Sequence, residues 1–384
     1  MLRNYLKSKY IQSRVQMILK NTKILLVHDY LNQLGGAERT LKVFKNIFPN
    51  ADTFALLYNK NKIKLQFKIK TSFIQKLPLK KNYKLYMPIF PIAVKSINFN
   101  NYDVIISSSH AWVKNINKPK ETLHICYCHT PMRYAWDLRE QYLKRENVFL
   151  RPFISLFLAY LRYWDKKGSK NVDFFIANSK NVANRIKKYY NRKSTVIYPP
   201  VDTKLFKLNT KKREYYYLIV SRLIEYKKVD LAIDAFKKIN KRLVIIGIGR
   251  DEKRLKKLSK NNKNIIFKGF AKSTELVKYY QNAKAFIHPQ IEDAGITSLE
   301  SQSCGTPVIA YAKGGALETV IEGKTGHFFH KQTPEALIKA IKEFEKMKLN
   351  PKDCRKNALK YDKEIFKKKI KKFVEEKYRE WKKK

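Results

Sequence analysis

Residues 23–28, Lys23-Ile24-Leu25-Leu26-Val27-His28, form a short and almost continuous apolar run. Such a run is typical of a strand that is buried on both faces of a parallel sheet. A Gly35-Gly36 pair follows it, and a helical pattern begins near Ala37. Buried strand, glycine loop and helix in this order predict the first unit of a βα series.

The same succession recurs along the chain in two series. The first continues with runs at 103–107, 123–128, 173–177 and 195–198. Ser179 is placed to cap the helix after 173–177, and Pro199-Pro200 ends the series because proline cannot donate to a ladder. The second series consists of runs at 216–220, 243–246, 264–267, 283–288 and 307–310. Two such series predict an α/β protein with two doubly wound, Rossmann-like parallel sheets that face a central cleft, where ligands collect at the strands' carboxyl ends.

The charge of the chain narrows the kinds of partner it can have. The 384 residues include 82 Lys and Arg against 32 Asp and Glu, which gives a formal net charge of +50. Such a surplus favours a nucleic acid, an anionic membrane or an acidic small substrate. The lysines are dispersed along the whole chain, and clustered RNA-binding motifs with interleaved aromatic residues are missing. We therefore expect no nucleic-acid partner, although a non-catalytic nucleic-acid-binding protein remains the alternative class.

Cysteine spacing and hydropathy indicate a cytoplasmic protein. The four cysteines contain no C-x-x-C pair, and a disulfide between Cys126 and Cys128 on one strand would be strained, so we expect reduced thiols. No run is long and uncharged enough to span a bilayer, and the N-terminus lacks the pattern of a signal peptide. The histidines show no metal-ligand spacing and Gly247-Ile248-Gly249 is too short for a dinucleotide fingerprint, so we expect neither a metal nor another cofactor.

The segment from Phe286 to His330 contains few lysines, unlike the rest of the chain. Between Phe286 and His330 only Lys313 and Lys324 are basic, whereas five acids occur there. A buried core would exclude charge of either sign, so the retained acids favour a binding site. Within this segment Gly295 precedes a predicted helix, whose first amides, near Ile296, can face a phosphate.

Charged side chains near the predicted strand ends are candidates for binding a nucleotide sugar. Glu292 lies before the helix and Glu300 on it, so the two carboxylates could bind sugar hydroxyls; from spacing alone, two solvated surface acids are the more probable interpretation. Arg222 and Lys227 follow the run at 216–220, where they can bind phosphate oxygens. In so basic a chain, this pair is weak evidence by itself.

Eight short motifs occur in order along the chain. They are Gly35-Gly36-Ala37-Glu38, His129-Thr130-Pro131, Ala177-Asn178-Ser179, Tyr198-Pro199-Pro200-Val201-Asp202, Ser221-Arg222-Leu223, Glu292-x7-Glu300, Cys304-Gly305-Thr306-Pro307-Val308-Ile309-Ala310 and Gly314-Gly315-Ala316-Leu317-Glu318. With these motifs the chain resembles the retaining family-4 glycosyltransferases of GT-B fold. The resemblance covers roughly residues 23–380, and residues 126–137 look like a branch with many mannosyl and related transferases.

The resemblance implies a role for each candidate site residue. Arg222 and Lys227 would hold the donor diphosphate, and the amides of Gly295 and Ile296 would support the sugar or its phosphate. Glu300 would bind the ribose hydroxyls, while Glu292 and His129 would act at the transferred sugar. Gly269 belongs to a loop that would contact the base, and Gly35 and Gly36 would lie against the diphosphate or the acceptor. His129 alone would more often be a structural histidine; the motif around it supports the role.

The resemblance also implies the division of the chain and the reaction. We expect a basic extension at 1–22, an acceptor-side domain at 23–203, a nucleotide-sugar domain at 204–360 and, at 361–384, a helix that packs back on the first domain. We expect metal-independent, retaining hexosyl transfer to a lipid-linked or polysaccharide acceptor, with GDP-mannose as the leading donor and a UDP-sugar as the alternative. Ala294 and Ser301-Gln302-Ser303 depart from the family pattern and put the choice of donor in doubt.

Two segments are candidates for contact with an anionic membrane surface. Residues 148–164 are strongly apolar with basic residues before and after, and could lie in an interface or form a buried helix of the first domain. The residues before Lys23 form a second candidate, a basic amphipathic helix. We expect a cytoplasmic protein that attaches peripherally to the inner face of the cytoplasmic membrane.

Overall fold

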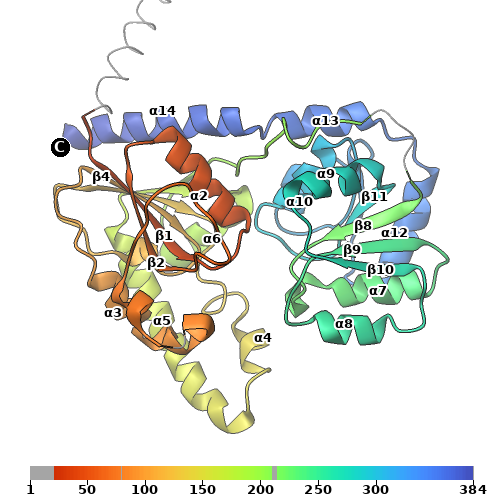
Figure 1. Cartoon of the computed structure of the whole chain (residues 1–384), viewed down its shortest axis with the longest axis horizontal. Coiled ribbons are helices and arrows are strands. Elements are labelled where there is room, and N and C mark those ends of the chain that lie inside the picture. Colours follow the sequence, from red (N-terminus) through yellow and green to blue (C-terminus); the bar gives the residue numbers. More distant parts are fainter. Residues whose placement is uncertain (1–20, 79, 210–213, 384) are drawn as a thin grey trace, which may run out of the picture. The chain divides into compact units, whose positions relative to one another are not determined.

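The chain folds into two compact units. The computed structural model describes residues 21–78, 80–209 and 214–383. Unit 1 runs up to Ile197 and also contains residues 367–384, and unit 2 is Tyr198–Phe366 (Figure 1). The divisions after 197 and 366 lie beside the predicted ones after 203 and 360. Residues 1–20 of the predicted N-terminal extension lie outside the described residues.

Unit 1 is built on a parallel sheet of seven strands in the order β3-β2-β1-β4-β5-β6-β7. Its strands are β1 (Ile24–Leu31), β2 (Asp52–Tyr58), β3 (Lys70–Thr71), β4 (Val104–Ser109), β5 (Leu123–Cys128), β6 (Phe174–Ala177) and β7 (Ser194–Val196). Its α-helices are α2 (Gly36–Ile47), α3 (Phe90–Lys95), α4 (Arg139–Leu143), α5 (Arg151–Gly168) and α6 (Lys180–Tyr190). The central strands β4 and β5 are buried at every residue, as the continuous apolar runs predict.

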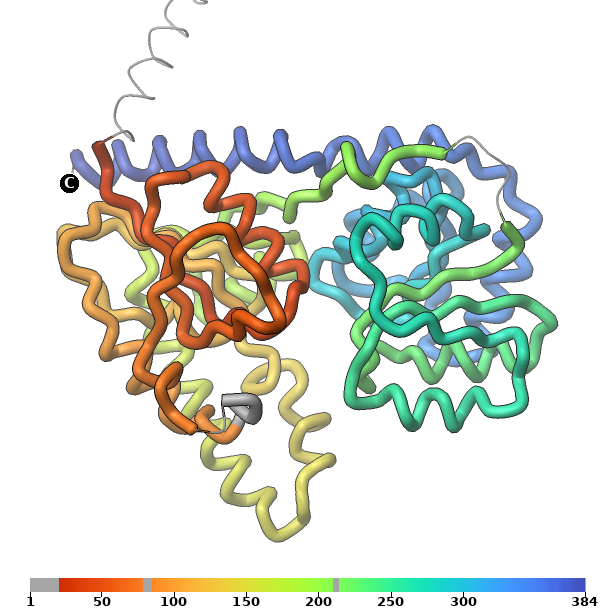
Figure 2. Tube along the Cα trace, in the orientation of Figure 1, coloured from red at the N-terminus to blue at the C-terminus, as the bar shows by residue number. Residues whose placement is uncertain are grey.

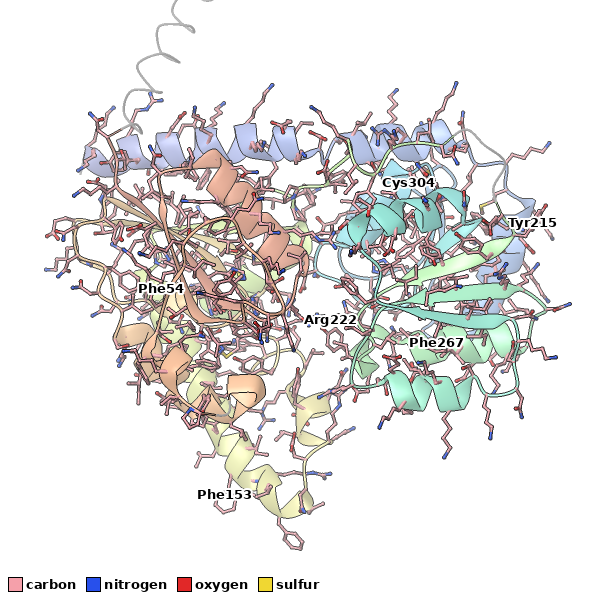
Figure 3. The ribbon with its side chains drawn as sticks, in the orientation of Figure 1. Phe54, Phe153, Tyr215, Arg222, Phe267 and Cys304 are labelled. Atoms are coloured by element: carbon pink, nitrogen blue, oxygen red, sulfur yellow. The ribbon has the colours of Figure 1, made fainter. Side chains whose placement is uncertain are left out.

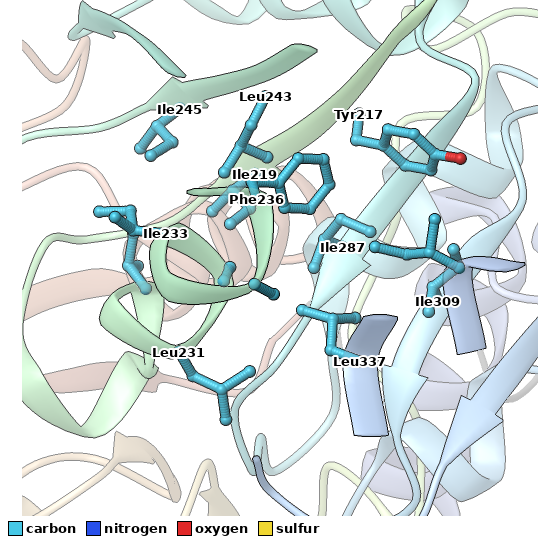
Figure 4. Close-up of a cluster of buried hydrophobic side chains, with 14 of the residues drawn as sticks. Tyr217, Ile219, Leu231, Ile233, Phe236, Leu243, Ile245, Ile287, Ile309 and Leu337 are labelled. Carbon is cyan, nitrogen blue, oxygen red and sulfur yellow. The ribbon is translucent and has the colours of Figure 1, made fainter. Parts of the chain in front are cut away.

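Unit 2 repeats the plan with six parallel strands in the order β10-β9-β8-β11-β12-β13. The strands are β8 (Tyr216–Val220), β9 (Arg242–Ile246), β10 (Ile265–Gly269), β11 (Ala285–His288), β12 (Val308–Tyr311) and β13 (Gly326–Phe329). The α-helices are α7 (Val229–Lys237), α8 (Glu252–Leu258), α9 (Ser273–Asn282), α10 (Ile296–Ser303), α11 (Ala316–Thr319), α12 (Pro334–Lys346) and α13 (Pro351–Leu359). Figure 4 shows the apolar layer between this sheet and α7, where Phe236 packs among side chains of β8, β9 and β11.

The last helix, α14 (Lys363–Lys382), passes from one unit to the other along the sequence. Its later residues pack on unit 1, where the Lys377 ammonium lies 4.6 Å from the centre of the Phe174 ring. The Lys118 ammonium in turn lies 4.7 Å from the centre of the Trp381 ring. Figure 2 follows this blue segment along unit 1. Its apolar stripe, which includes the buried Ile370 and Val374, provides the contact surface.

Sequence patterning identified most strands of both sheets, and the predicted α/β fold with two doubly wound sheets is confirmed. Ser179 caps α6 as predicted, since its hydroxyl accepts a hydrogen bond of 3.1 Å from the Val182 amide. All four cysteines are buried and free. Strands β2, β3 and β13 were not predicted, because β2 begins with Asp52 and Thr53 and the other two are short and partly exposed.

The sequence left open whether residues 148–164 lie in a membrane interface or form a buried helix. Helix α5, which contains most of them, has one buried side and one exposed side. Leu158, Leu161, Trp164 and Asp165 are buried in unit 1, as in a core helix. Phe153 and Leu156 are instead exposed. None of the described helices is both long and apolar enough to cross a bilayer.

Candidate active site

The N-terminus of α10 is open and close to charged groups of unit 2. Gly295 is its N-cap, with a left-handed backbone (φ 66°, ψ 46°) that glycine adopts without strain. Glycine has no side chain to cap the helix, so its first amides near Ile296 are available to an anion. The sequence analysis predicted that a helix begins directly after Gly295, and the structure confirms this start.

Lys227 and Glu292, predicted separately from two motifs, form an ion pair. Lys227 ends the short helix Glu225–Lys227 after β8 and is 8% exposed, whereas Glu292 lies on the loop before α10. Gln290 donates a second hydrogen bond of 3.2 Å to the same carboxylate oxygen, Oε1. An ammonium and a carboxylate therefore meet at the loop that leads into α10, where the ammonium could bind a phosphate oxygen.

His288 is a residue of this site that the sequence analysis did not select. It ends β11, is completely buried, and neither ring nitrogen has a hydrogen-bond partner among the described residues. A Cβ built on Gly295 would lie 3.5 Å from its Cε1 atom. Burial lowers the pKa of His288 to about 4, with Glu292 opposing this and Lys227 adding to it, so the ring is neutral at pH 7. A neutral imidazole with two unsatisfied nitrogens can bind a ligand group here.

Arg222 lies on the loop after β8, and Figure 3 labels it and Tyr215 at opposite ends of that strand. Its guanidinium donates a hydrogen bond of 3.1 Å to the Tyr226 hydroxyl. The Lys227 ammonium lies 5.3 Å from the centre of the Tyr226 ring. Arg222 and Lys227 therefore both contact the side chain of Tyr226, one at its hydroxyl and the other at its ring.

Glu300 lies one turn into α10 and is 2% exposed. Its carboxylate accepts a hydrogen bond of 3.2 Å from the Tyr280 hydroxyl of α9. This hydrogen bond fixes the carboxylate of Glu300 between α10 and α9. The interpretation of Glu300 as a solvated surface acid is wrong, because its carboxylate is buried.

The polar residues 301–303 of α10, which depart from the family pattern, anchor the helix. Ser301 donates to the Thr306 carbonyl at 3.0 Å and Gln302 to the Thr319 carbonyl at 2.9 Å. Asn357 of α13 donates to Gln302 at 2.8 Å. All these polar side chains are buried and paired, so they hold α10 rigidly instead of facing a ligand.

Two glycine loops support the site without providing side chains. Gly315 donates from its amide to the Glu292 carbonyl at 2.8 Å, and a Cβ on Gly314 would lie 2.5 Å from that oxygen. Glycine is therefore required where the loop of Gly314 and Gly315 meets the loop of Glu292. Gly269, at the end of β10, has a φ of 67° and accepts a 2.7 Å hydrogen bond from the Gly247 amide.

His129, the candidate from unit 1, follows β5 and belongs to a group of three histidines, of which His28 is buried and His110 and His129 are half-buried. Its Nε2 lies 2.8 Å from the Ser108 hydroxyl, which is 3.1 Å from His28 Nδ1. The His28 and His110 ring centres are 6.1 Å apart. Burial, with further effects from the neighbouring rings, lowers the pKa of His28 to about 4 and that of His129 well below its usual value. Both rings are neutral at pH 7.

Asp29 organises this histidine group and was not predicted. Its buried carboxylate accepts hydrogen bonds of 2.6–2.9 Å from the four consecutive amides of residues 110–113, and it lies 3.1 Å from His110 Nδ1. Burial raises the pKa of Asp29, but His110 and the amide donors outweigh burial and hold it below its usual value. The sequence signal was weak, because Asp29 and the loop that it binds are some 80 residues apart.

Gly35 and Gly36 form the N-terminus of α2 in unit 1. The Gly35 amide donates a 2.8 Å hydrogen bond to the Glu38 carboxylate, and a Cβ on Gly35 would lie 2.9 Å from that oxygen. Gly36 is the first residue of the helix, and its carbonyl accepts from the Thr40 hydroxyl at 2.8 Å. The predicted residues are thus divided, with Gly35, Gly36 and His129 in unit 1 and the others in unit 2.

Two family profiles match consecutive parts of the chain. Residues 35–205 match the family described as "Glycosyltransferase Family 4", and residues 200–361 match "Glycosyl transferases group 1". Together the two matches span residues 35–361, and they support assignment of the chain to the glycosyltransferases of GT-B fold. The boundary between the two profiles lies beside Pro199-Pro200, and the predicted family resemblance is confirmed at this level.

Curated relatives match this chain over part of their length. An uncharacterized glycosyltransferase of Methanocaldococcus jannaschii is 30% identical over 54% of this chain and 58% of its own. The GDP-mannose-dependent alpha-(1-6)-phosphatidylinositol monomannoside mannosyltransferase of Mycolicibacterium smegmatis is 30% identical over 32% of this chain and 36% of its own. The chain thus spans about a third to just over half the length of these relatives.

Solved structures show the same fold across nearly the whole chain. Sucrose-phosphate synthase from Thermosynechococcus elongatus has a TM-score of 0.74 at 16% identity, over 93% of this chain and 99% of that one. Anabaena HepE in complex with UDP-glucose has a TM-score of 0.68 at 17% identity, over 91% of this chain and 99% of that one. At these identities the likeness concerns the GT-B fold alone.

Proposed function

We propose that this protein transfers a hexose from a nucleotide sugar to a lipid-linked or polysaccharide acceptor, with retention of anomeric configuration and without a metal ion. The proposal is carried by one observation in unit 2. Lys227 and Glu292 are paired beside the open N-terminus of α10, where the buried His288 has two unpartnered nitrogens. A cation, helix amides and a neutral polar ring suit a sugar diphosphate better than they suit a nucleic-acid backbone.

Each candidate residue then has a distinct task. Arg222 and Lys227 bind the diphosphate, and the Gly295 and Ile296 amides stabilise the negative charge that develops as it leaves. A diphosphate at Lys227 competes with Glu292 for the ammonium, which frees the carboxylate to bind the sugar. Glu300 binds the ribose and the loop at Gly269 contacts the base. In unit 1, His129 donates a hydrogen bond to the sugar, and Gly35 and Gly36 lie against the diphosphate or the acceptor.

GDP-mannose is the leading donor in this proposal, and a UDP-sugar is the second candidate. The mycobacterial relative named above supports the first, since it is GDP-mannose-dependent and acts on a phosphatidylinositol mannoside. The Anabaena structure with UDP-glucose supports the second. We propose further that the protein works in the cytoplasm as a peripheral enzyme at an anionic membrane, in the biosynthesis of a polysaccharide or a lipid-linked glycan.

A transfer assay tests this function. The protein is incubated with GDP-mannose or UDP-glucose, each labelled in the sugar, and with a bacterial lipid extract or a polysaccharide fraction. We expect label to enter one acceptor fraction from one donor, and NMR of the product to show the anomer of the donor. The variant Glu292→Gln, which keeps the shape of the side chain, should lose transfer. Inverted anomeric configuration in the product would contradict the retaining mechanism.

A further inference from the structure

A second apolar face of α5 has no role in the core of unit 1. Residues 148–163 contain seven of the large hydrophobic side chains that are exposed in the described part of the chain. Five of them recur at intervals of four, three, four and three residues. The last four lie in α5 and align along one side of it, and the first lies in the short 3-10 helix Val148–Leu150 that leads into α5. We name this set the outer stripe: Phe149, Phe153, Leu156, Tyr160 and Tyr163.

The outer stripe is exposed to a degree unusual for such side chains. Phe149 is 83% exposed, and Phe153 and Leu156 are each 73% exposed. Figure 3 labels Phe153 near the tip of the α4–α5 hairpin, where this hairpin extends beyond the sheet of unit 1. Single exposed hydrophobic residues are normal, but a contiguous apolar face marks an interaction surface.

Loose packing does not account for this exposure, because the opposite side of α5 is firmly anchored. Its Asp165 is buried and forms an ion pair with the buried Lys114. The same carboxylate accepts hydrogen bonds from Tyr190 at 2.6 Å and Trp136 at 2.9 Å. The ammonium of Lys114 also donates to the Ala111 carbonyl at 2.6 Å. The helix is therefore fixed, and it holds the outer stripe outward on a rigid support.

The charges around the outer stripe are almost all positive. Residues 141–170 contain seven basic and two acidic residues, a net charge of 7 − 2 = +5. One of the two acids is Asp165, which is buried in its ion pair, so Glu146 is the only acid of this segment that is exposed. The seven basic residues are Lys144, Arg145, Arg151, Arg162, Lys166, Lys167 and Lys170. An apolar stripe bordered by cations is complementary to a surface with anionic headgroups over hydrocarbon.

We propose that the outer stripe of α5 inserts into the interface of an anionic lipid membrane while the flanking basic residues bind the headgroups. A second copy of the chain fits less well, because each copy would bring the same +5 segment to the contact. A nucleic acid would satisfy the cations but would leave Phe149, Phe153 and Leu156 in water. The inference deepens the membrane partner of the proposed function and rests on that function for its purpose, which is to bring the enzyme to a lipid-linked acceptor.

The first test compares two matched triple variants in vesicle sedimentation without donor or acceptor. Phe149→Ser, Phe153→Ser and Leu156→Ser are combined in one variant. The control combines Tyr215→Ser, Leu359→Ser and Ile365→Ser, which alters three exposed hydrophobic residues of unit 2. We expect the first variant to bind phosphatidylglycerol-containing vesicles about tenfold more weakly than the control, with weak binding of both to pure phosphatidylcholine. Equal binding by the two variants overturns the proposal.

The second test measures insertion directly and does not depend on loss of binding. Phe153→Trp places a fluorescent ring in the outer stripe, and Tyr215→Trp places one in unit 2. Brominated phosphatidylglycerol should quench additional fluorescence in the first variant and not in the second. Equal quenching overturns the proposal, as does a dimer of the parent chain that only the serine variant in α5 disrupts. Thermal stabilisation by nucleotide sugars is measured in parallel, so a failure of the donor site is distinguished from a failure of the docking surface.

Discussion

The two units place different kinds of polar group at the carboxyl ends of similar parallel sheets. In unit 2 the ends of β8 and β11 lead to an ion pair between Lys227 and Glu292 and to an open helix N-terminus. In unit 1 the ends of β1 and β5 carry two neutral histidines that contact Ser108, the buried His28 and the half-buried His129. Charge and free amides suit a diphosphate, whereas neutral hydrogen-bonding rings suit sugar hydroxyls. One architecture thus supports two binding chemistries, and the residues after each strand decide which one.

The largest expected effect tests the organisation of unit 1. Asp29→Ala leaves the four amides of residues 110–113 without their acceptor in a buried loop. Unsatisfied buried groups cost about 1–3 kcal/mol each, so we expect unfolding to become easier by about 3 kcal/mol or more. Urea denaturation measures this change. The matched variant Asp52→Ala, which removes an exposed pair with Lys70, should cost less than about 1 kcal/mol. Similar losses for both variants contradict the role given to Asp29.

Acid should destabilise unit 1 more than unit 2. In unit 1 the pKa of His28 is about 4, that of His124, a buried residue of β5, is about 3, and that of His129 is also strongly lowered. In unit 2 the pKa of His288 is lowered to about 4. Between pH 6.5 and 4 these histidines bind protons in the unfolded chain but stay neutral in the folded protein. The free energy of unfolding therefore falls as the pH falls. The loss of stability at pH 5 is on the order of 2 kcal/mol for His28 and about the same for His124.

Hydrogen exchange followed by mass spectrometry resolves the two units in this experiment. Protection in β4 and β5 should decrease between pH 7 and 5 by more than protection in β8 and β12, after correction for the intrinsic rates. The same loss in both units would show that the histidine group does not distinguish them.

Affinity for a nucleoside diphosphate should depend on charged side chains of unit 2 more than on His129 of unit 1. Arg222→Ala removes charge-assisted hydrogen bonds worth about 1.5–3 kcal/mol each, so nucleoside-diphosphate binding should weaken at least about tenfold. The control Arg242→Ala alters an exposed arginine at the start of β9 and should leave binding unchanged. His129→Ala should lower turnover with little change in affinity for the diphosphate. Calorimetry measures the diphosphate affinity of all three variants, and the transfer assay measures the turnover of His129→Ala. Unchanged affinity in Arg222→Ala refutes its diphosphate role.

The smallest expected effect concerns metal ions. Arg222, Lys227 and the amides of α10 provide the positive charge that a leaving diphosphate needs. Transfer should therefore continue in excess EDTA at nearly its original rate. Loss of activity that manganese restores would show that unit 2 lacks sufficient charge by itself.

Local patterns in the sequence predicted the fold and several local features of the candidate site in unit 2. Buried strands appeared as apolar runs, Ser179 as a cap, and Gly295 as a turn before a helix, because each signal lies within a few residues. Asp29 and His288 escaped prediction for a different reason. Their environments depend on strands that pair across long stretches of chain, as when β1 brings His28 beside Ser108. The paired residues 301–303 of α10 escaped for the same reason, since their partners come from distant segments.

Thermal denaturation with a panel of ligands tests the central claim, that unit 2 binds a nucleotide sugar. The panel contains GDP-mannose, UDP-glucose, other nucleotide sugars and a single-stranded RNA, with parent protein and Arg222→Ala side by side. A ligand at 100 times its dissociation constant should stabilise the folded state by about 2.7 kcal/mol. We predict that at least one nucleotide sugar raises the melting temperature of the parent protein, that Arg222→Ala reduces this rise, and that RNA has no comparable effect. Stabilisation by RNA and by no nucleotide sugar would contradict the account.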